Sequence, residues 1–308
     1  MMQLGFVSAI LPDCDFRTVM TTAADLGYQT VEMMCWPPGK AERRYAGVTH
    51  IDVLNLGEPQ HREIRDVIEQ TGVTISSLGY YPNPLSADAD ESRIAFDHIR
   101  RVIDAAASLD IGRMTTFIGR DPKTSIEANF ERFETLWPPV IRHAADAGVR
   151  IGIENCPMLF TADEWPGGKN LATSPAIWRR MFQVIDDPHF GLNYDPSHLS
   201  YMQMDPVEPL KEFRDRLHHV HAKDVRVDRS DLNDVGILAY PLLYHRPKLP
   251  GLGDVPWGRF FATLGDVGYD GPVCVEIEDR VYETDLESRL AALRQCQTFL
   301  RNFIPALA

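Results

Sequence analysis

The sequence predicts an α/β protein of the (β/α)₈ barrel class, also called the TIM barrel. Short apolar runs alternate with amphipathic stretches eight times along the chain, which is the pattern of parallel strands joined by helices. No glycine-rich phosphate-binding fingerprint follows the first apolar run, and this disfavours a doubly wound nucleotide-binding sheet. The chain has 308 residues, and one such barrel takes about 250 residues or more. We therefore expect a single barrel domain over residues 1–308.

The eight expected strands are short runs rich in apolar and β-branched residues. Several of them end close to a glycine or a proline, as expected where a buried strand gives way to a loop. In chain order the expected strands cover residues 4–9, 30–34, 74–78, 113–118, 149–154, 190–194, 217–222 and 272–277.

The expected helices are the amphipathic stretches between these strands. The clearest covers residues 91–109, where isoleucine, valine and alanine recur at three- and four-residue spacing. Pro138 and Pro139 lie inside a longer stretch at 125–147, where we expect a kink or a break because proline removes a helical hydrogen bond. Further helices are expected at 16–26, at 60–70, from about 174, at 206–216, just before the last strand, and at 286–303.

The composition is that of a soluble globular protein, with 44% hydrophobic and 24% charged residues. The net charge of −13 argues against non-specific binding of nucleic acid, which needs a basic surface. No run approaches the roughly 18 uninterrupted apolar residues of a membrane span, and the N-terminus lacks the charged region of a signal peptide. The five cysteines are scattered without a C-x-x-C pair. We expect a cytoplasmic protein that binds neither nucleic acid nor membrane.

Residues that can bind a metal ion stand at the ends of four consecutive expected strands. They are Glu154, Asp195, His221 and Glu276. Barrel enzymes build their active sites at this end of the strands, and carboxylates with an imidazole suit a divalent ion. Each residue alone is equally a cap or turn residue, and the 195–198 run, Asp-Pro-Ser-His, is by itself more typical of a turn. Together they predict one divalent metal ion, with Mn²⁺ expected and Mg²⁺, Co²⁺, Fe²⁺ or Zn²⁺ as alternatives.

The motifs around these residues resemble the sugar phosphate isomerase/epimerase superfamily, the xylose isomerase-like barrels. The matching motifs are Ile-Glu-Asn, Asp-Pro-Ser-His, His-Ala-Lys-Asp, Gly-Leu-Gly-Asp-Val-Pro-Trp and Val-Glu-Ile-Glu-Asp. The resemblance covers nearly the whole chain and is strongest over residues 149–279. It implies one catalytic divalent metal ion held by two glutamates, an aspartate and a histidine, which correspond here to Glu154, Glu276, Asp195 and His221.

The resemblance also implies residues that contact a substrate. His198 matches a substrate-contacting histidine, Arg226 matches an arginine after the seventh strand, and residues 251–257 resemble a loop that closes the site. Trp257 in that loop is a candidate wall for a sugar ring, although loop tryptophans equally pack against their own scaffold. Ketose 3-epimerases usually continue their first glutamate as Asn-Arg-x-Glu, whereas residues 155–158 are Asn-Cys-Pro-Met. This departure disfavours a simple free ketose as substrate.

The expected activity is that of a divalent-metal-dependent sugar isomerase or epimerase. A divalent ion stabilises the charge that forms when a proton leaves the carbon next to a carbonyl, and Glu154 and Glu276 are the candidate proton carriers. The alternative is a lyase or dehydratase of inososes or 3-keto-glycosides, which the Asp-Pro-Ser-His and His-x-Lys-Asp motifs favour. An endonuclease IV-like phosphodiesterase is less favoured, because it needs three metal ions and a basic surface. A small sugar or polyol is the expected partner.

Several neighbouring polar residues have two interpretations each. Glu32 is either an ion-pair partner in the barrel or a substrate contact, and Lys223 is either a partner of Asp224 or a substrate contact. His219 lies on the same face of its strand as His221. We favour His221 as the metal ligand because it is closer to the end of the strand.

Residues 226–256 form an insertion after the seventh strand. Its 235–245 segment is too apolar for a free surface loop, and a structureless loop of this length is uncommon in a compact domain. We predict that the insertion covers the site as a lid or packs against a second subunit, with its leucine and tyrosine side chains buried. As a lid it would supply Arg226, His245 and Arg246 as substrate contacts. We expect a homo-oligomer.

Overall fold

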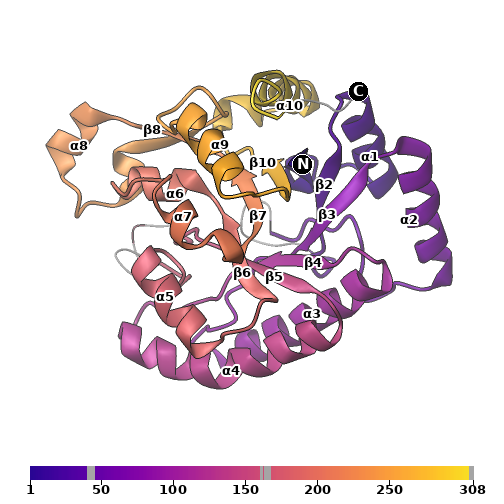
Figure 1. Cartoon of the computed structure of the whole chain (residues 1–308), viewed down its shortest axis with the longest axis horizontal. Helices are drawn as coiled ribbons and strands as arrows, with labels where there is room; N and C mark the ends of the chain where they lie inside the picture. The colour runs from indigo at the N-terminus through magenta and orange to yellow at the C-terminus, as the bar shows by residue number, and fades with distance from the viewer. Residues whose placement is uncertain (40–45, 160–161, 163–167, 305–308) are drawn as a thin grey trace.

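A closed barrel of eight parallel strands forms the centre of the molecule (Figure 1). The computed structural model describes residues 1–39, 46–159, 162 and 168–304. The strands follow one another around the barrel in the order β1-β10-β7-β6-β5-β4-β3-β2, and β2 pairs with β1 to close it. The predicted (β/α)₈ class is confirmed. No helix of the described part of the chain is long and apolar enough to cross a membrane.

The strand bounds agree closely with the sequence patterns. β6 and β7 have the expected bounds, whereas β1 ends earlier because a 3₁₀ turn, Ser8–Ile10, follows it. The last strand also ends earlier than expected, so that Glu276 lies just beyond it. The barrel strands are β1 (Gln3–Val7), β2 (Thr30–Met34), β3 (Thr74–Gly79), β4 (Arg113–Thr116), β5 (Arg150–Glu154), β6 (Phe190–Tyr194), β7 (Leu217–Ala222) and β10 (Pro272–Val275).

Helices surround the barrel and are capped by side chains at their N-termini. Asp15, Asp88, Ser125 and Asp285 each accept a hydrogen bond from a backbone N–H of the first helical turn. The helices are α1 (Phe16–Asp25), α2 (Glu58–Thr71), α3 (Ala89–Ser108), α4 (Ile126–Asp146), α5 (Pro175–Val184), α6 (Pro196–Tyr201), α7 (Pro209–Glu212), α9 (Trp257–Asp266) and α10 (Leu286–Leu300), with short 3₁₀ turns at Arg214–Arg216 and Arg280–Tyr282.

Helix α4 runs without a break through Pro138 and Pro139, so the expected interruption is wrong. Its buried face holds the helix against the barrel on both sides of the prolines. Trp137 is fully buried there, and its indole N–H donates to the carbonyl of Ile118 at 3.1 Å. Tertiary packing outweighs the local cost of the prolines.

The insertion folds into an arm, defined here as residues 224–248. Strands β8 (Asp224–Val227) and β9 (His245–Lys248) pair antiparallel, and α8 (Arg229–Val235) with a 3₁₀ turn, Pro241–Leu243, lies between them. The base of the arm packs on α6 through a cluster of Tyr201, Val225, Val227 and Tyr244. Figure 1 shows α8 extending away from the barrel.

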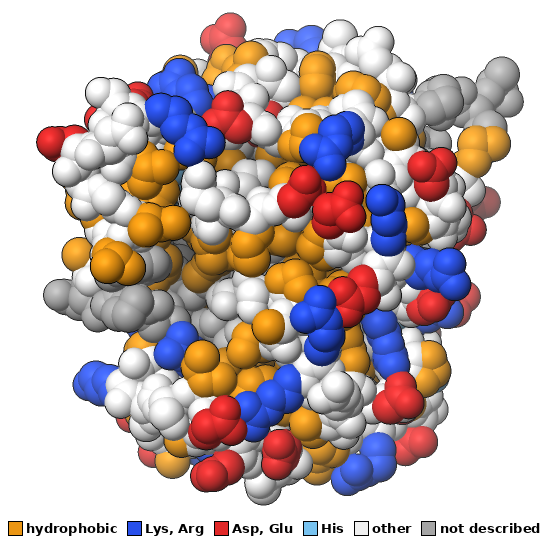
Figure 2. Space-filling view, turned by 60° about the vertical axis from the view of Figure 1, so that its left-hand side comes forward, with side chains coloured by type: hydrophobic (Ala, Val, Ile, Leu, Met, Phe, Trp, Pro, Cys, Tyr) orange, Lys and Arg blue, Asp and Glu red, His pale blue; other side chains and the backbone are white. Residues whose placement is uncertain are grey.

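Within the single chain the apolar residues of the arm are only partly buried, and burial of its leucines against a second subunit stays a prediction. Tyr244 is buried, but Ile237, Leu238 and Leu243 are each at least half exposed. Figure 2, which brings this side of the molecule forward, shows hydrophobic side chains on the surface among charged side chains of both signs. The arm lines no part of the pocket described below, so the chain by itself does not use it as a lid over that pocket.

Asp224 ties the base of the arm to the 251–257 loop. Its buried carboxylate accepts hydrogen bonds from the backbone N–H groups of Gly251, Gly253 and Val255 and from the indole N–H of Trp257, at 2.8 to 3.1 Å. A Cβ atom at Gly253 would collide with this carboxylate, which explains the glycine. The loop motif is therefore a structural clamp on Asp224.

Candidate metal centre

The structure brings the four predicted ligand residues together at the C-terminal end of the barrel. Glu154 ends β5, Asp195 follows β6 and caps α6, His221 lies in β7, and Glu276 follows β10. These four strands are neighbours in the barrel, which is why residues far apart in the sequence meet. One donor atom from each residue lies within 4.8 Å of the others.

One buried donor atom of this cluster, His221 Nδ1, is left without a hydrogen bond among the described residues. Asp195 Oδ2 has no well-directed hydrogen bond, but it lies 3.1 Å from Lys223 Nζ and 3.2 Å from His198 Nε2. His221 Nδ1 lies 3.6 Å from Glu154 Oε1 and 3.5 Å from Glu276 Oε2, which is too far for a good hydrogen bond. Because buried polar atoms are nearly always bonded, converging carboxylate oxygens and an unpaired imidazole nitrogen fit a divalent metal ion. These four residues would hold it.

Glu32 orients His221 from the inside of the barrel. The Nε2 atom of His221 donates to Glu32 Oε2 at 2.7 Å, so Nδ1 is the ring nitrogen that could offer its lone pair to a metal ion. Glu32 is fully buried and also accepts hydrogen bonds from Thr115 Oγ1, at 2.8 Å, and from the Tyr81 hydroxyl. Burial acts to raise the pKa of Glu32, but His221 lowers it below its usual value. Of its two interpretations, the structure supports the ion-pair partner.

His219 lies deeper in the barrel than His221 and is fully hydrogen-bonded. Its Nε2 atom lies 3.1 Å from Ser76 Oγ and its Nδ1 atom lies 2.9 Å from Asn193 Oδ1. Burial lowers the pKa of His219 to about 3, so the ring is neutral. His219 is thus a structural neighbour of Glu32 and His221, outside the four-residue cluster.

His198 stands beside two of the ligand residues. Its Nε2 atom lies 3.3 Å from Glu154 Oε1 and 3.2 Å from Asp195 Oδ2. The side chain is buried, and its Nδ1 atom has no hydrogen-bond partner among the described residues. It is therefore close enough to position both carboxylates.

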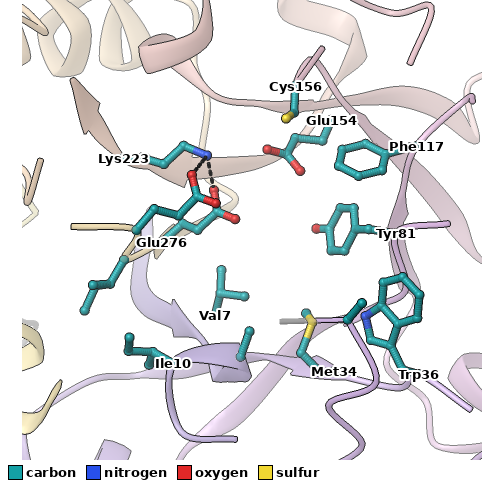
Figure 3. Close-up of a pocket in the computed structure, with 14 residues that line it drawn as sticks. Val7, Ile10, Met34, Trp36, Tyr81, Phe117, Glu154, Cys156, Lys223 and Glu276 are labelled. Carbon is teal, nitrogen blue, oxygen red and sulfur yellow. Dashed lines mark hydrogen bonds and ion pairs between the residues drawn. The ribbon is translucent and has the colours of Figure 1, made fainter. Parts of the chain in front are cut away.

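Lys223 places a positive charge at the upper edge of the cluster (Figure 3). Its Nζ atom lies 2.6 Å from Glu276 Oε2, 3.1 Å from Asp195 Oδ2 and 3.1 Å from Glu278 Oε2. Burial acts to lower the pKa of Lys223, but these carboxylates raise it well above its usual value. Burial likewise acts to raise the pKa values of Asp195 and Glu276, and Lys223 lowers both. All these groups are therefore charged, and Asp224 is not the partner of Lys223.

A cavity of about 690 Å³ opens above the cluster and is continuous with solvent. Glu154, Cys156, Lys223, Glu276 and Glu278 border it. Sequence reasoning missed Glu278 as a residue of this cavity. The signal that could have identified it is its position two residues after Glu276, because alternate residues of an extended chain share a face.

The cavity is lined by none of the three predicted substrate contacts, His198, Arg226 and Trp257. Arg226 is exposed in β8 of the arm, and Trp257 is buried with its indole N–H bonded to Asp224. The scaffold interpretation of Trp257 is the one that the structure supports. Of the arm residues, His245 stacks on Tyr201 with ring centres 4.1 Å apart, and Arg246 pairs with Asp231. A further loop residue, Trp165, lies outside the described residues.

Replacing Glu32 with glutamine is expected to weaken Mn²⁺ binding about 10- to 100-fold. Glutamine has the same shape but no charge to hold the proton of His221 on Nε2. Titration calorimetry with Mn²⁺ measures the effect. The matched control is Glu69→Gln on the exposed face of α2. Unchanged affinity in the Glu32 variant would mean that Glu32 does not orient His221.

Comparison with known proteins identifies a matching family and several relatives of this chain. A family model described as a xylose isomerase-like TIM barrel matches residues 20–302. The uncharacterized protein YfiH of Bacillus subtilis is 26% identical over 330 aligned positions, which cover 96% of this chain and 99% of that protein. An inosose dehydratase of Geobacillus kaustophilus is 35% identical over 101 residues, a match that spans 32% of this chain and 33% of the dehydratase.

Solved structures with the same fold cover nearly the whole chain. The IolI protein with a bound zinc atom superposes with a TM-score of 0.74 at 14% identity, over 98% of each chain. D-psicose 3-epimerase from Clostridium cellulolyticum H10, solved with D-tagatose, gives a TM-score of 0.66 at 15% identity, over 99% of this chain and 100% of the epimerase. At this level of identity the likeness shows the fold.

Proposed function

This chain belongs to the xylose isomerase-like TIM-barrel family, and on that premise we propose that it is a divalent-metal-dependent isomerase or epimerase of a keto-sugar or polyol. The observation that carries the proposal is the cluster of Glu154, Asp195, His221 and Glu276. Its donor atoms converge below an open cavity, and one of them, His221 Nδ1, is buried without a hydrogen bond among the described residues. The zinc atom bound by the IolI protein supports a metal site in this fold.

The chain's own carboxylates would move the protons of such a reaction. A divalent ion bound by the cluster would act as a Lewis acid on a substrate carbonyl and its neighbouring hydroxyl. Glu154, at the end of β5, and Glu276, just after β10, border the cavity, and Figure 3 shows both carboxylates at its charged edge near Lys223. One glutamate would remove the proton next to the carbonyl, and the other would return a proton from the opposite side.

A lyase or dehydratase reaction on the same site is the second candidate. It starts with the same proton removal and differs in losing a hydroxyl from the adjacent carbon. Lys223 favours it, because an ammonium group fixed beside Glu276 could donate to a leaving hydroxyl. The partial similarity to an inosose dehydratase gives further support.

Deuterium exchange tests both candidates at once. Purified protein loaded with Mn²⁺ is incubated in D₂O with ketoses, inososes and 3-keto-glycosides, and exchange is followed by NMR. We expect exchange at one carbon next to a carbonyl, abolished by removing the metal with a chelator. The appearance of an epimer or isomer supports the first candidate, and a dehydrated product supports the second. No exchange with any member of the panel, with Mn²⁺ bound, contradicts both.

A Lys223→Met variant separates the two reactions. Because the metal ligands and Glu154 remain, we expect deuterium exchange to stay within about ten-fold of the unaltered protein. In a dehydratase the lost proton donor would lower product formation about 100-fold or more while exchange continues. Exposed Lys123 provides the control, Lys123→Met. Complete loss of exchange with Mn²⁺ still bound would show that Lys223 is needed for proton removal itself, contrary to the role assigned here.

Three further properties stay predictions. We expect an unphosphorylated substrate, because an acidic protein does not attract phosphate groups, and Mn²⁺ as the working ion. We also expect a homo-oligomer, which light scattering coupled to gel filtration would detect.

A further inference from the structure

The cavity above the metal centre has two chemically different halves. The strands that supply the ligands, β5, β7 and β10, border it with charged side chains, of which Glu154, Lys223 and Glu276 are the principal ones. The neighbouring strands β1 to β4 and the segments that follow them border it with Val7, Ile10, Met34, Trp36, Tyr81 and Phe117, here called the apolar wall. Figure 3 shows Val7, Ile10, Met34 and Trp36 facing the cavity from the side away from Lys223 and Glu154.

The apolar wall offers little to a sugar hydroxyl. None of its six side chains is charged, and the one hydroxyl, on Tyr81, is already engaged: it donates to Glu32, and Asn193 Nδ2 donates to it at 3.1 Å. A sugar ring could pack only its C–H face on this wall, and its hydroxyl groups would find no charged partner there. Burying a polar group without a hydrogen bond is unfavourable, so the wall favours an apolar group over a hydroxyl-bearing edge.

The wall is also rigid enough to recognise a flat group. Trp36 packs edge-to-face on Tyr80 with ring centres 4.9 Å apart, and Phe117 packs in the same way on Tyr81 at 4.9 Å. Rings fixed by their neighbours lose little freedom when a ligand binds.

From these observations we infer that the substrate is amphiphilic: a polyhydroxy ketone that carries an apolar substituent, best an aromatic ring. The hydroxylated part lies over the metal centre, and the substituent lies against the apolar wall. This inference rests on the proposed function, because it specifies the substrate class of the same site. It explains why half of a catalytic cavity in an acidic protein is built from aliphatic and aromatic side chains, since such surface exposed in a cleft is typical of a binding site for an apolar group.

Two unreactive sugars test the wall without relying on turnover. Phenyl β-D-glucopyranoside and methyl β-D-glucopyranoside have the same hydroxyl groups and differ only in the apolar substituent. Their affinities for the Mn²⁺-loaded protein are measured by titration calorimetry. We expect the phenyl glucoside to bind at least about ten-fold more tightly, because the ring buries more apolar surface than the methyl group. Equal affinity, or no binding of the phenyl glucoside at millimolar concentration, overturns the inference.

Two substitutions test whether the preference for the phenyl glucoside comes from the apolar wall. Met34→Gln changes polarity at nearly constant size, and Trp36→Ala removes the largest ring. Each is expected to reduce the preference for the phenyl glucoside to within about two-fold while Mn²⁺ affinity is unchanged, which also shows that the variant is folded. Val281→Ser, at an exposed position outside the cavity, should keep the full preference. A preference that survives both wall substitutions places the phenyl group elsewhere and contradicts the inference.

The outcome is separable from that of the proposed reaction. Deuterium exchange without any preference for the phenyl glucoside removes the amphiphilic substrate and leaves the isomerase or lyase chemistry standing. A preference for the phenyl glucoside without exchange on any ketone supports binding of an amphiphilic ligand and contradicts the isomerase or lyase chemistry.

Discussion

Replacing Glu154 with glutamine is expected to slow deuterium exchange at least about a thousand-fold at saturating Mn²⁺. Glu154 is 3% exposed and borders the cavity, and its Oε1 atom belongs to the four-residue cluster. The substitution keeps the shape of the side chain but removes both the proton acceptor and one negative charge at the metal centre. We therefore expect weaker Mn²⁺ binding as well as slower exchange, measured by calorimetry and by NMR in D₂O.

The control for this experiment is Glu131→Gln on the exposed face of α4. It loses the same charge from the same protein without touching the cavity, so exchange should be unchanged. If Glu154→Gln exchanges within a few-fold of the unaltered protein, Glu154 is neither the base nor an essential ligand. Proton removal would then have to be assigned to Glu276.

Replacing Asp224 with alanine is expected to lower the free energy of unfolding by about 3–5 kcal/mol. The substitution removes the acceptor of the N–H groups of Gly251, Gly253 and Val255 and of the indole N–H of Trp257, and of these residues Val255 and Trp257 are buried. Part of the loss is offset, because a buried charge is also removed. Urea unfolding followed by circular dichroism measures the change.

The comparison variant is Asp228→Ala at the N-terminus of α8. Asp228 accepts hydrogen bonds from Ser230 and Asp231 at the start of a short, exposed helix, so its loss should cost about 1 kcal/mol. Similar, small losses in the two variants would show that the 251–257 loop does not depend on the Asp224 clamp.

The fold and the position of the four-residue cluster could be predicted because both follow from local pattern. Each barrel strand is a short apolar run, and β6 ends where Asp195 and Pro196 interrupt one. Parallel strands in a barrel all point the same way, so residues that end them share one face of the molecule. This is why Glu154, Asp195 and His221 could be grouped without any knowledge of distances.

The partners of these residues could not be predicted, because they come from distant parts of the chain. Glu32 is 189 residues from His221 in sequence, and only closure of the barrel brings their side chains to 2.7 Å. Lys223 is next to Asp224 in sequence, yet its charge pairs with carboxylates on other strands, such as Glu276, 53 residues away. Local pattern identifies candidate ligands, and tertiary structure decides which of them interact.

The arm shows what hydrophobicity alone leaves open. Its apolar run predicted burial as a lid or against a second subunit, and within the single chain only part of it packs on α6, while Leu238 is 84% exposed. Trp257 lies in a loop motif that resembles a site-closing segment, but its indole N–H binds Asp224. Neither outcome can be derived from the sequence pattern, because the pattern does not say which surface an apolar side chain meets.

The central claim is that Glu154, Asp195, His221 and Glu276 hold one divalent metal ion. Crystals of the protein grown with Mn²⁺, with diffraction data collected at the manganese absorption edge, test it most directly. The account predicts one anomalous peak per chain at roughly 2.0–2.3 Å from His221 Nδ1 and from an oxygen of each carboxylate. A peak at another place, or no peak from a protein saturated with Mn²⁺, would contradict it.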